Sequence, residues 1–160
     1  MESVRFTHVS ISANDLDESV RFYTDLFGME RIPSPDFDVP VEWLRCGDRQ
    51  LHLFERDVDA PEHHHLALHV DRFEEVYRVA LDGDLFEDYF DETTPAVYEL
   101  PDGSIQTYIR DPSGNLVECN RPTDEGLSPE IAETIRRQSE VVPQSDEALR
   151  SSLYEVENRG

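Results

Sequence analysis

The sequence contains no lysine. All 14 basic residues are arginine, and they stand against 36 acidic residues, so the formal net charge is −22. A surface this acidic repels phosphate backbones and anionic headgroups, which excludes nucleic acid and membrane surfaces as partners. Acidic surfaces without lysine are typical of proteins from high-salt cytoplasms, where salt screens the repulsion between like charges. We therefore expect a halophilic protein that loses stability at low salt.

Cysteine and long apolar runs are also scarce. The two cysteines, Cys46 and Cys119, form no CxxC pair and lie in apolar patterns, so we expect reduced core residues, not a disulfide or a zinc site. No stretch has the length of a membrane span and no signal-peptide pattern is present, so the expected location is the cytoplasm. An apolar content of 38% with clear periodicity speaks against disorder, and 160 residues suffice for one domain or two fused halves.

The first part of the chain predicts a strand, a helix and a hairpin. Apolar residues recur at helical spacing in the stretch before Gly28, so we expect a helix there. Asn14 or Asp15 is expected to cap its start, and Gly28 to end it. The strands are expected at residues 6–12, 41–46 and 50–54, the last two joined by a turn at Gly47 and Asp48.

The same pattern returns after 57 residues. A shift of that length places His8 on His65 and Leu16 on Phe73, and it needs no gap. The second copy predicts a strand from His65, a helix over residues 71–81 and strands over residues 96–100, 104–110 and 115–120, after an irregular acidic stretch at residues 82–94. Each half is then one strand, one helix and about three strands, unless two amphipathic helices agree by chance.

Residues 121–160 differ from both halves. Ser128 and Pro129 are expected to open a short helix with Ile131, Ala132 and Ile135 on its apolar face. Ser145 is expected to open another, with Leu149, Leu153, Tyr154 and Val156. We therefore divide the chain into a domain at residues 1–120, with modules at about 4–56 and 63–120, and a helical extension at residues 121–160.

Four residues in the predicted strands are candidate metal ligands. The repeat pairs His8 with His65, and it pairs His52 with Glu118, each of the latter two in the last strand of its half. Histidines with a carboxylate suit Fe(II), Mn(II), Ni(II), Co(II) or Zn(II). Alternatively, each histidine is a hydrogen-bonded core or surface residue, although a buried Glu118 would still need a partner. His63 and His64 precede the strand, and His69 is a candidate for the pocket wall.

The motifs around these residues resemble the vicinal oxygen chelate superfamily, which includes glyoxalase I, extradiol ring-cleaving dioxygenases, methylmalonyl-CoA epimerase and the bleomycin and fosfomycin resistance proteins. The matching stretches are THVSI at residues 7–11, FYTDLFGM at 22–29, HHLALHV at 64–70 and YIRDPSGNLVE at 108–118. The resemblance implies an α+β fold of two paired βαβββ modules that form a curled, barrel-like mixed sheet around a divalent metal. It implies metal ligands at His8, His65 and Glu118, with His52 at the fourth position.

The resemblance leaves the reaction open between branches. The stretch from Tyr108 to Glu118 resembles the signature of the dioxygenases, which implies Fe(II) or Mn(II), with His52 as acid or base and Tyr108 as a hydrogen-bond donor. The histidine that this branch places upstream is absent from residues 97–103. Glyoxalase I prefers a glutamate at the position of His52, where it is both ligand and proton shuttle.

We therefore expect a metal-dependent enzyme that chelates two adjacent oxygens of a small-molecule substrate, most simply by dioxygenase-like ring cleavage. The alternatives are a glyoxalase I-like isomerase or lyase, and a non-enzymatic binding protein of the resistance type. Fe(II) or Mn(II) is the favoured metal, with Ni(II), Co(II) or Zn(II) as the other candidates. Relatives of this size often dimerise, which implies a homodimer.

Overall fold

The computed structural model describes residues 4–87 and 97–154. These residues belong to two compact units, the first formed by Met1–Leu66 with Arg110–Val117, and the second by Ala67–Ile109 with Glu118–Gly160. None of the helices in the described part of the chain has the length and apolar character that a membrane span requires.

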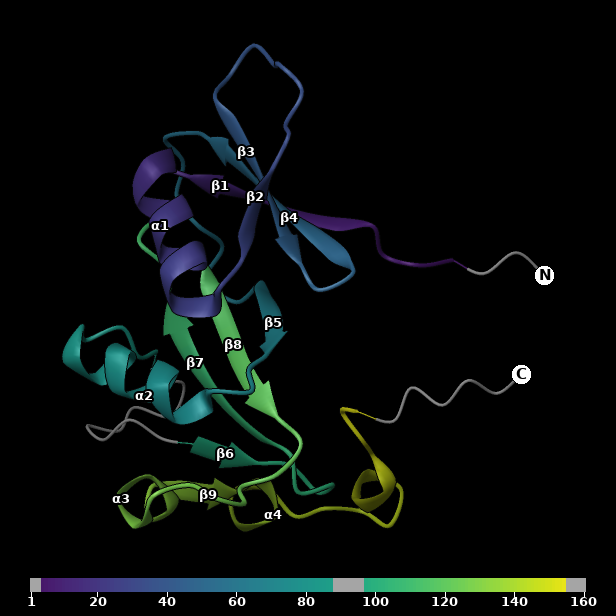
Figure 1. Ribbon diagram of the computed structural model, residues 1–160. Helices are drawn as coiled ribbons and strands as arrows, with labels where there is room; N and C mark the ends of the chain where they lie inside the picture. Colours follow the sequence, from purple (N-terminus) through teal and green to yellow (C-terminus); the bar gives the residue numbers. More distant parts are fainter. Residues whose placement is uncertain (1–3, 88–96, 155–160) are drawn as a thin grey trace. The chain divides into compact units, whose positions relative to one another are not determined.

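The first unit is built on a four-stranded sheet (Figure 1). In chain order its elements are β1 (His8–Ala13), α1 (Leu16–Phe27), β2 (Glu30–Ile32), β3 (Val41–Cys46) and β4 (Arg49–Glu55). The strand order in the sheet is β1-β4-β3-β2, with β1 parallel to β4 and the other pairs antiparallel. Helix α1 packs on β3 and β4. Sequence analysis found every element of this unit except β2.

Helix α1 begins and ends where its sequence predicts. Asp15 is the N-cap, and its carboxylate accepts the backbone N–H of Glu18 at 2.9 Å. The amide of Leu16 donates to Oε2 of Glu55 at 3.3 Å, which ties the helix start to the end of β4. Gly28 ends the helix with a φ of 68°, a left-handed conformation that glycine adopts without steric cost.

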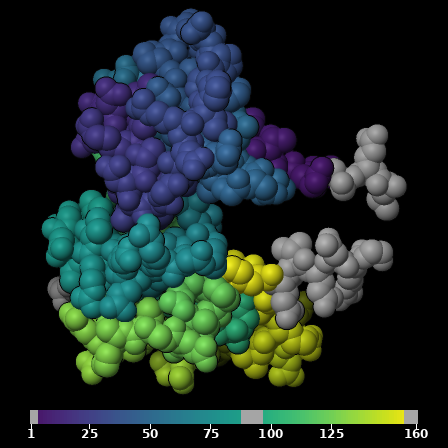
Figure 2. All heavy atoms as spheres, viewed as in Figure 1, coloured from purple at the N-terminus to yellow at the C-terminus, as the bar shows by residue number. Residues whose placement is uncertain are grey.

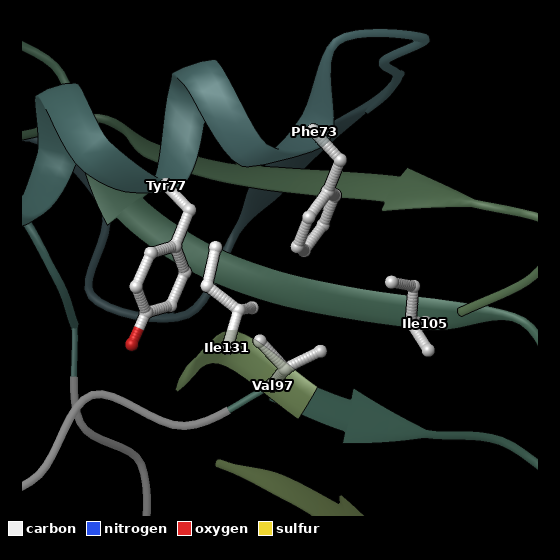
Figure 3. Close-up of a cluster of buried hydrophobic side chains, with 5 residues drawn as sticks. All are labelled: Phe73, Tyr77, Val97, Ile105 and Ile131. Carbon is white, nitrogen blue, oxygen red and sulfur yellow. The ribbon is translucent and has the colours of Figure 1, made fainter. Parts of the chain in front are cut away.

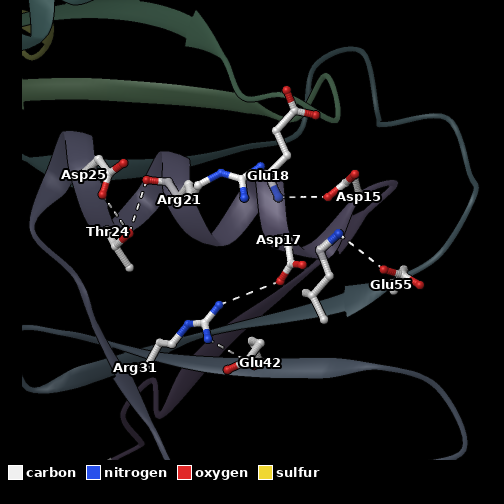
Figure 4. Close-up of polar contacts among 10 residues, drawn as sticks. Asp15, Asp17, Glu18, Arg21, Thr24, Asp25, Arg31, Glu42 and Glu55 are labelled. Carbon is white, nitrogen blue, oxygen red and sulfur yellow. Dashed lines mark hydrogen bonds and ion pairs between the residues drawn. The ribbon is translucent and has the colours of Figure 1, made fainter.

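Exposed ion pairs surround the start of this helix (Figure 4). Arg31 on β2 lies 3.9 Å from a carboxylate oxygen of Asp17 and 3.8 Å from one of Glu42. Because such pairs stay in water and are screened by salt, each contributes at most about 1 kcal/mol. These ion pairs therefore add little to the stability of the first unit, which comes from the buried apolar face of α1.

The second sheet repeats the order of the first. Its elements are β5 (His65–His69), α2 (Phe73–Asp82), β6 (Val97–Glu99), β7 (Ile105–Arg110) and β8 (Leu116–Arg121), and β9 (Ile135–Arg137) is added from the C-terminal part. The strand order is β5-β8-β7-β6-β9, so both sheets place the fourth strand of the module beside the first. The two first strands begin at His8 and His65, and the two helices at Leu16 and Phe73, each 57 residues apart. The predicted repeat and the mixed α+β fold class are confirmed, with the described strands arranged as sheets of four and five.

The core of the second unit contains side chains from the second module and from the C-terminal part (Figure 3). Buried residues of α2, β6, β7 and the C-terminal part form one cluster: Phe73, Tyr77, Val97, Ile105 and Ile131. Ile131 lies in α3 (Pro129–Ala132), which follows the last strand of the repeat. The C-terminal part is therefore packed into this unit.

The C-terminal part contains less helix than its sequence predicts. Helix α3 ends at Ala132, and Ile135 lies in β9, which pairs parallel with β6. Two short helical segments follow, α4 (Gln138–Val141) and a 3-10 turn at Ala148–Arg150. The predicted longer helix from Ser145 is wrong. Its apolar face is too thin to stabilise a helix, and Leu153 and Tyr154 form hydrogen bonds with other groups of the second unit. Val156, Ala96 and most of the predicted acidic stretch at 82–94 lie outside the described residues.

Candidate functional site

Three aromatic rings stack on one face of the first sheet. The ring of His52 on β4 lies between Trp43 of β3 and His8 of β1, with centroid separations of 4.0 and 4.1 Å and interplanar angles of 2° and 14°. Trp43 is the direct cross-strand partner of His52. Nε2 of His52 lies 2.8 Å from Oε1 of Gln50. The pairing of β1 and β3 with β4 thus brings the two histidines together.

The stacking limits what the two histidines can share. A nitrogen lone pair lies in the plane of its ring, and a metal ion sits about 2.0–2.1 Å along it. Two nearly parallel rings held face to face have no point within that distance along both lone pairs. Burial, and secondly the neighbouring His8, lower the pKa of His52, so its imidazole is neutral at pH 7. In this arrangement His52 is a neutral neighbour of His8.

Glu118 is buried in β8 with 5% of its surface exposed. Each of its carboxylate oxygens accepts a hydrogen bond from a neutral group: Oε2 from the Tyr108 hydroxyl at 3.1 Å and Oε1 from Nδ2 of Asn120 at 2.8 Å. Gln106 in turn donates to the Tyr108 hydroxyl at 3.1 Å. These bonds hold both carboxylate oxygens in place, as the groups around a metal ligand do.

His65 lies at the edge of a cavity in the first unit. The cavity has a volume of about 290 Å³, and its lining includes Ser10, Ser12, Asp59, His64, His65 and Asn115. His65 itself is exposed, and its Nδ1 lies 3.3 Å from the backbone oxygen of His63. The cavity offers hydroxyl, amide and imidazole groups to a small polar molecule.

The turn between β7 and β8 explains much of the YIRDPSGNLVE motif. The buried carboxylate of Asp111 accepts four hydrogen bonds: from the Tyr23 hydroxyl at 2.8 Å, the amides of Ser113 and Asn115 at 2.9 and 2.8 Å, and Nδ2 of Asn115 at 2.9 Å. Gly114 has a φ of 81°, which the turn requires. The motif therefore holds this turn against α1 and sets up the strand that carries Glu118.

Sequence reasoning missed two residues of this region. Asn120 lies two positions beyond Glu118, so strand alternation places it on the same face, and that parity could have identified it. Tyr154 lies far along the chain and was expected only as one apolar position of a helix. Its hydroxyl bonds to Asn120 and lies 2.9 Å from Nδ1 of His69, the histidine expected in the pocket wall.

The donor chemistry of the predicted ligands fits a divalent metal. His8 and His65 provide imidazole nitrogens from the first unit, and Glu118 provides a buried carboxylate from the second. Within either unit alone, two of these three donors at most are present. Across residues 4–87 and 97–154, no group of three or more His, Cys, Asp or Glu side chains is assembled as a metal site.

Comparison with known proteins identifies the family. Residues 5–119 match the model of the Glyoxalase/Bleomycin resistance protein/Dioxygenase superfamily. A comparison with the sequences of curated proteins found no match.

Solved structures of this superfamily share the fold. The chain is similar to lactoylglutathione lyase from Agrobacterium tumefaciens, with 23% identity, a TM-score of 0.56, and coverage of 79% of this chain and 100% of that one. It is similar to the oxidase ChaP-H2, with 23% identity, a TM-score of 0.60 and coverage of 79% and 100%. It is also similar to a mutant of the fosfomycin resistance protein FosX from Listeria monocytogenes in complex with Mn(II) and dihydroxypropylphosphonic acid, with 16% identity, a TM-score of 0.60 and coverage of 78% and 96%. With the family model spanning most of its length and the repeated βαβββ topology in both halves, the chain belongs to the Glyoxalase/Bleomycin resistance protein/Dioxygenase superfamily.

Proposed function

We propose that the protein is a divalent-metal-dependent enzyme that chelates two adjacent oxygens of a small substrate and cleaves an aromatic ring in the manner of an extradiol dioxygenase. The observation that carries this proposal is the stack of Trp43, His52 and His8. A neutral histidine held beside a ligand histidine suits an acid or base that acts on the substrate. A glyoxalase I-like site would instead need a group at this position that both binds the metal and moves a proton.

The proposed metal ligands are His8, His65 and Glu118. Fe(II) or Mn(II) is favoured for this donor set, and the similar FosX structure contains Mn(II). When bound, the metal would act as a Lewis acid toward the two substrate oxygens and bring O2 next to the substrate. The proposal requires donors from both halves of the chain, which is how the repeat distributes them.

The residues around these ligands have separate roles in the proposal. His52, neutral at pH 7, accepts a proton from a substrate hydroxyl, and Gln50 at 2.8 Å fixes the orientation of its ring. Tyr108 donates to Glu118 and so holds one carboxylate oxygen in place. The overall reaction inserts both atoms of O2 into a catechol and opens its ring, so it consumes no external reductant.

The proposed reaction predicts a yellow ring-cleavage product. Protein reconstituted with Fe(II) in molar NaCl is expected to convert a catechol to a product with visible absorbance. Replacing His52 with alanine is expected to lower kcat by about 100-fold or more, because it removes the proton acceptor. Trp43→Phe is the matched control, since it keeps an aromatic ring in the stack, and it should retain most of the activity.

Three other results of this assay would contradict the proposal. Turnover of a hemithioacetal without catechol cleavage would identify a glyoxalase I-like enzyme. Tight binding of a small molecule without turnover would identify a binding protein. Folded protein that contains no metal and shows no activity would exclude the enzyme altogether.

We also propose that the protein is a halophilic, cytoplasmic homodimer. A net charge of −22 without lysine favours high salt, and the exposed Phe6 and Val9, at 83% and 44%, offer apolar surface beside His8. The free energy of unfolding is expected to rise as NaCl increases from 0.1 M to molar levels. Light scattering in molar salt is expected to give twice the chain mass of 18.5 kDa. Stability independent of salt, or a monomeric mass, would contradict these expectations.

A further inference from the structure

Two hydrogen bonds join the end of the described chain to the rest of the second unit. The backbone N–H of Leu153 donates to Oδ2 of Asp102 at 2.6 Å, in the turn between β6 and β7. One residue later, the hydroxyl of Tyr154 donates to Oδ1 of Asn120 on β8. Figure 2 shows the yellow spheres of this segment against the teal and green spheres of the same unit. The segment therefore delivers Tyr154 to the strand that carries Glu118.

Tyr154 and Glu118 hold the side chain of Asn120 from its two ends. An amide side chain has one oxygen that accepts and one nitrogen that donates. Because Tyr154 donates to the oxygen, the nitrogen is directed at Glu118, whose Oε1 accepts it at 2.8 Å. The carboxylate only accepts hydrogen bonds and so keeps the amide nitrogen on its side, while the Tyr154 hydroxyl holds the amide oxygen from the other side. Tyr154 thus fixes the position of a side chain that donates to Glu118.

The tyrosine hydroxyl is held as a donor. Burial, followed by the negative charge of Glu118, raises the pKa of Tyr154 to about 12, so the hydroxyl keeps its proton at neutral pH. His69 stands on the other side, with its ring edge-on to the tyrosine at 5.5 Å between centroids and 82° between planes. Nδ1 of His69 lies 2.9 Å from the same hydroxyl. Nε2 of His69 lies 2.9 Å from Asp71, which orients the imidazole.

We propose that Tyr154 is a positioning residue of the metal site, which acts through Asn120 to hold the carboxylate of Glu118 in its ligating orientation. This inference rests on the proposed function, because it gives Glu118 the role of a metal ligand. Both Asn120 and Tyr154 lie beyond residues 5–119, the part that matches the superfamily model. The C-terminal part thereby adds a hydrogen bond to the strand that carries Glu118.

The test is the affinity of the full-length protein for Mn(II), measured by calorimetric titration in molar NaCl. Tyr154→Phe keeps the ring against His69 and removes only the hydroxyl. We expect the dissociation constant to rise by about 10-fold, the lower end of the effect of groups that orient metal ligands. The matched control is Tyr77→Phe, which removes a hydroxyl from the core of the same unit and should leave Mn(II) affinity unchanged.

A double-mutant cycle separates positioning from general stability. Asn120→Ala is expected to weaken Mn(II) binding by itself, and adding Tyr154→Phe to it should cause no further loss, since the tyrosine acts through the amide. The electron paramagnetic resonance spectrum of bound Mn(II) should change in both single variants and remain the same in Tyr77→Phe. Circular dichroism and the unfolding midpoint establish that each variant is folded.

The outcomes distinguish this inference from the function on which it rests. Wild-type protein that binds no Mn(II) would overturn both. Wild-type protein that binds Mn(II), with equal affinity in Tyr154→Phe, would overturn only the role of Tyr154. Losses that add independently in the double variant would also overturn it, because Tyr154 would then act by a route other than Asn120.

Discussion

Replacing Glu118 with glutamine is expected to weaken Mn(II) binding by more than about 100-fold while the protein stays folded. The substitution keeps the size of the side chain and removes the negative charge, and a neutral amide is a poor ligand for a hard divalent cation. Glutamine also has a nitrogen where the carboxylate has an acceptor, so one of the bonds from Tyr108 and Asn120 is lost. Calorimetric titration with Mn(II) in molar NaCl measures the change.

Glu30→Gln is the matched control for this substitution. Glu30 lies on β2, is exposed, and pairs with Arg45 at 3.7 Å, so its replacement removes the same charge far from the proposed ligands in sequence. The control should retain the affinity of the wild-type protein. If Glu118→Gln is folded and binds Mn(II) as tightly as the control, Glu118 is not a ligand and the proposed site is wrong.

Replacing Asp111 with alanine is expected to lower the free energy of unfolding by about 3–5 kcal/mol. Its carboxylate is 4% exposed and accepts four hydrogen bonds, so the substitution leaves several buried donors without their acceptor. Two of these donors are backbone amides of the turn, which water does not reach easily in a buried position. Chemical denaturation in molar NaCl, followed by circular dichroism, gives the difference.

Tyr23→Phe separates one of these bonds from the rest. It removes only the hydroxyl that joins α1 to Asp111 and keeps the buried ring, so it should cost about 1 kcal/mol. If Asp111→Ala cost no more than Tyr23→Phe, the turn would be held by other contacts, and the carboxylate would not be its organising group.

The repeat could be predicted because it depends on how residues are spaced along the sequence. Helix starts at Leu16 and Phe73, and strand starts at His8 and His65, depend on local patterns that survive low sequence identity. Caps were less regular. Asp15 caps α1 with its side chain, whereas the equivalent position of α2 is Arg72, which makes no such bond. Each of these features involves residues close together in the sequence.

Other features depend on partners that the sequence does not place. The strands β2 and β9 have three residues each and form by pairing with β3 and β6, which come from other parts of the chain. The sequence predicted strands for His8 and His52, but the stacked rings depend on Trp43 from another strand. Tyr154 bonds to Asn120, which lies 34 residues earlier in the sequence, and no local pattern predicts such a contact. A shared ion for His8, His65 and Glu118 likewise depends on tertiary structure, which no local pattern specifies.

The two short strands have a consequence for the behaviour of concentrated solutions. A sheet edge has unpaired backbone groups, so it is a template on which the strands of other molecules add and grow into aggregates. Here β2 forms one edge of its sheet and β9 one edge of the other, and both are three residues long and contain arginine. In molar salt, net charge no longer keeps molecules apart, because it is screened within about 3 Å. At these two edges, short length and charged side chains limit strand addition under conditions where long-range repulsion is screened.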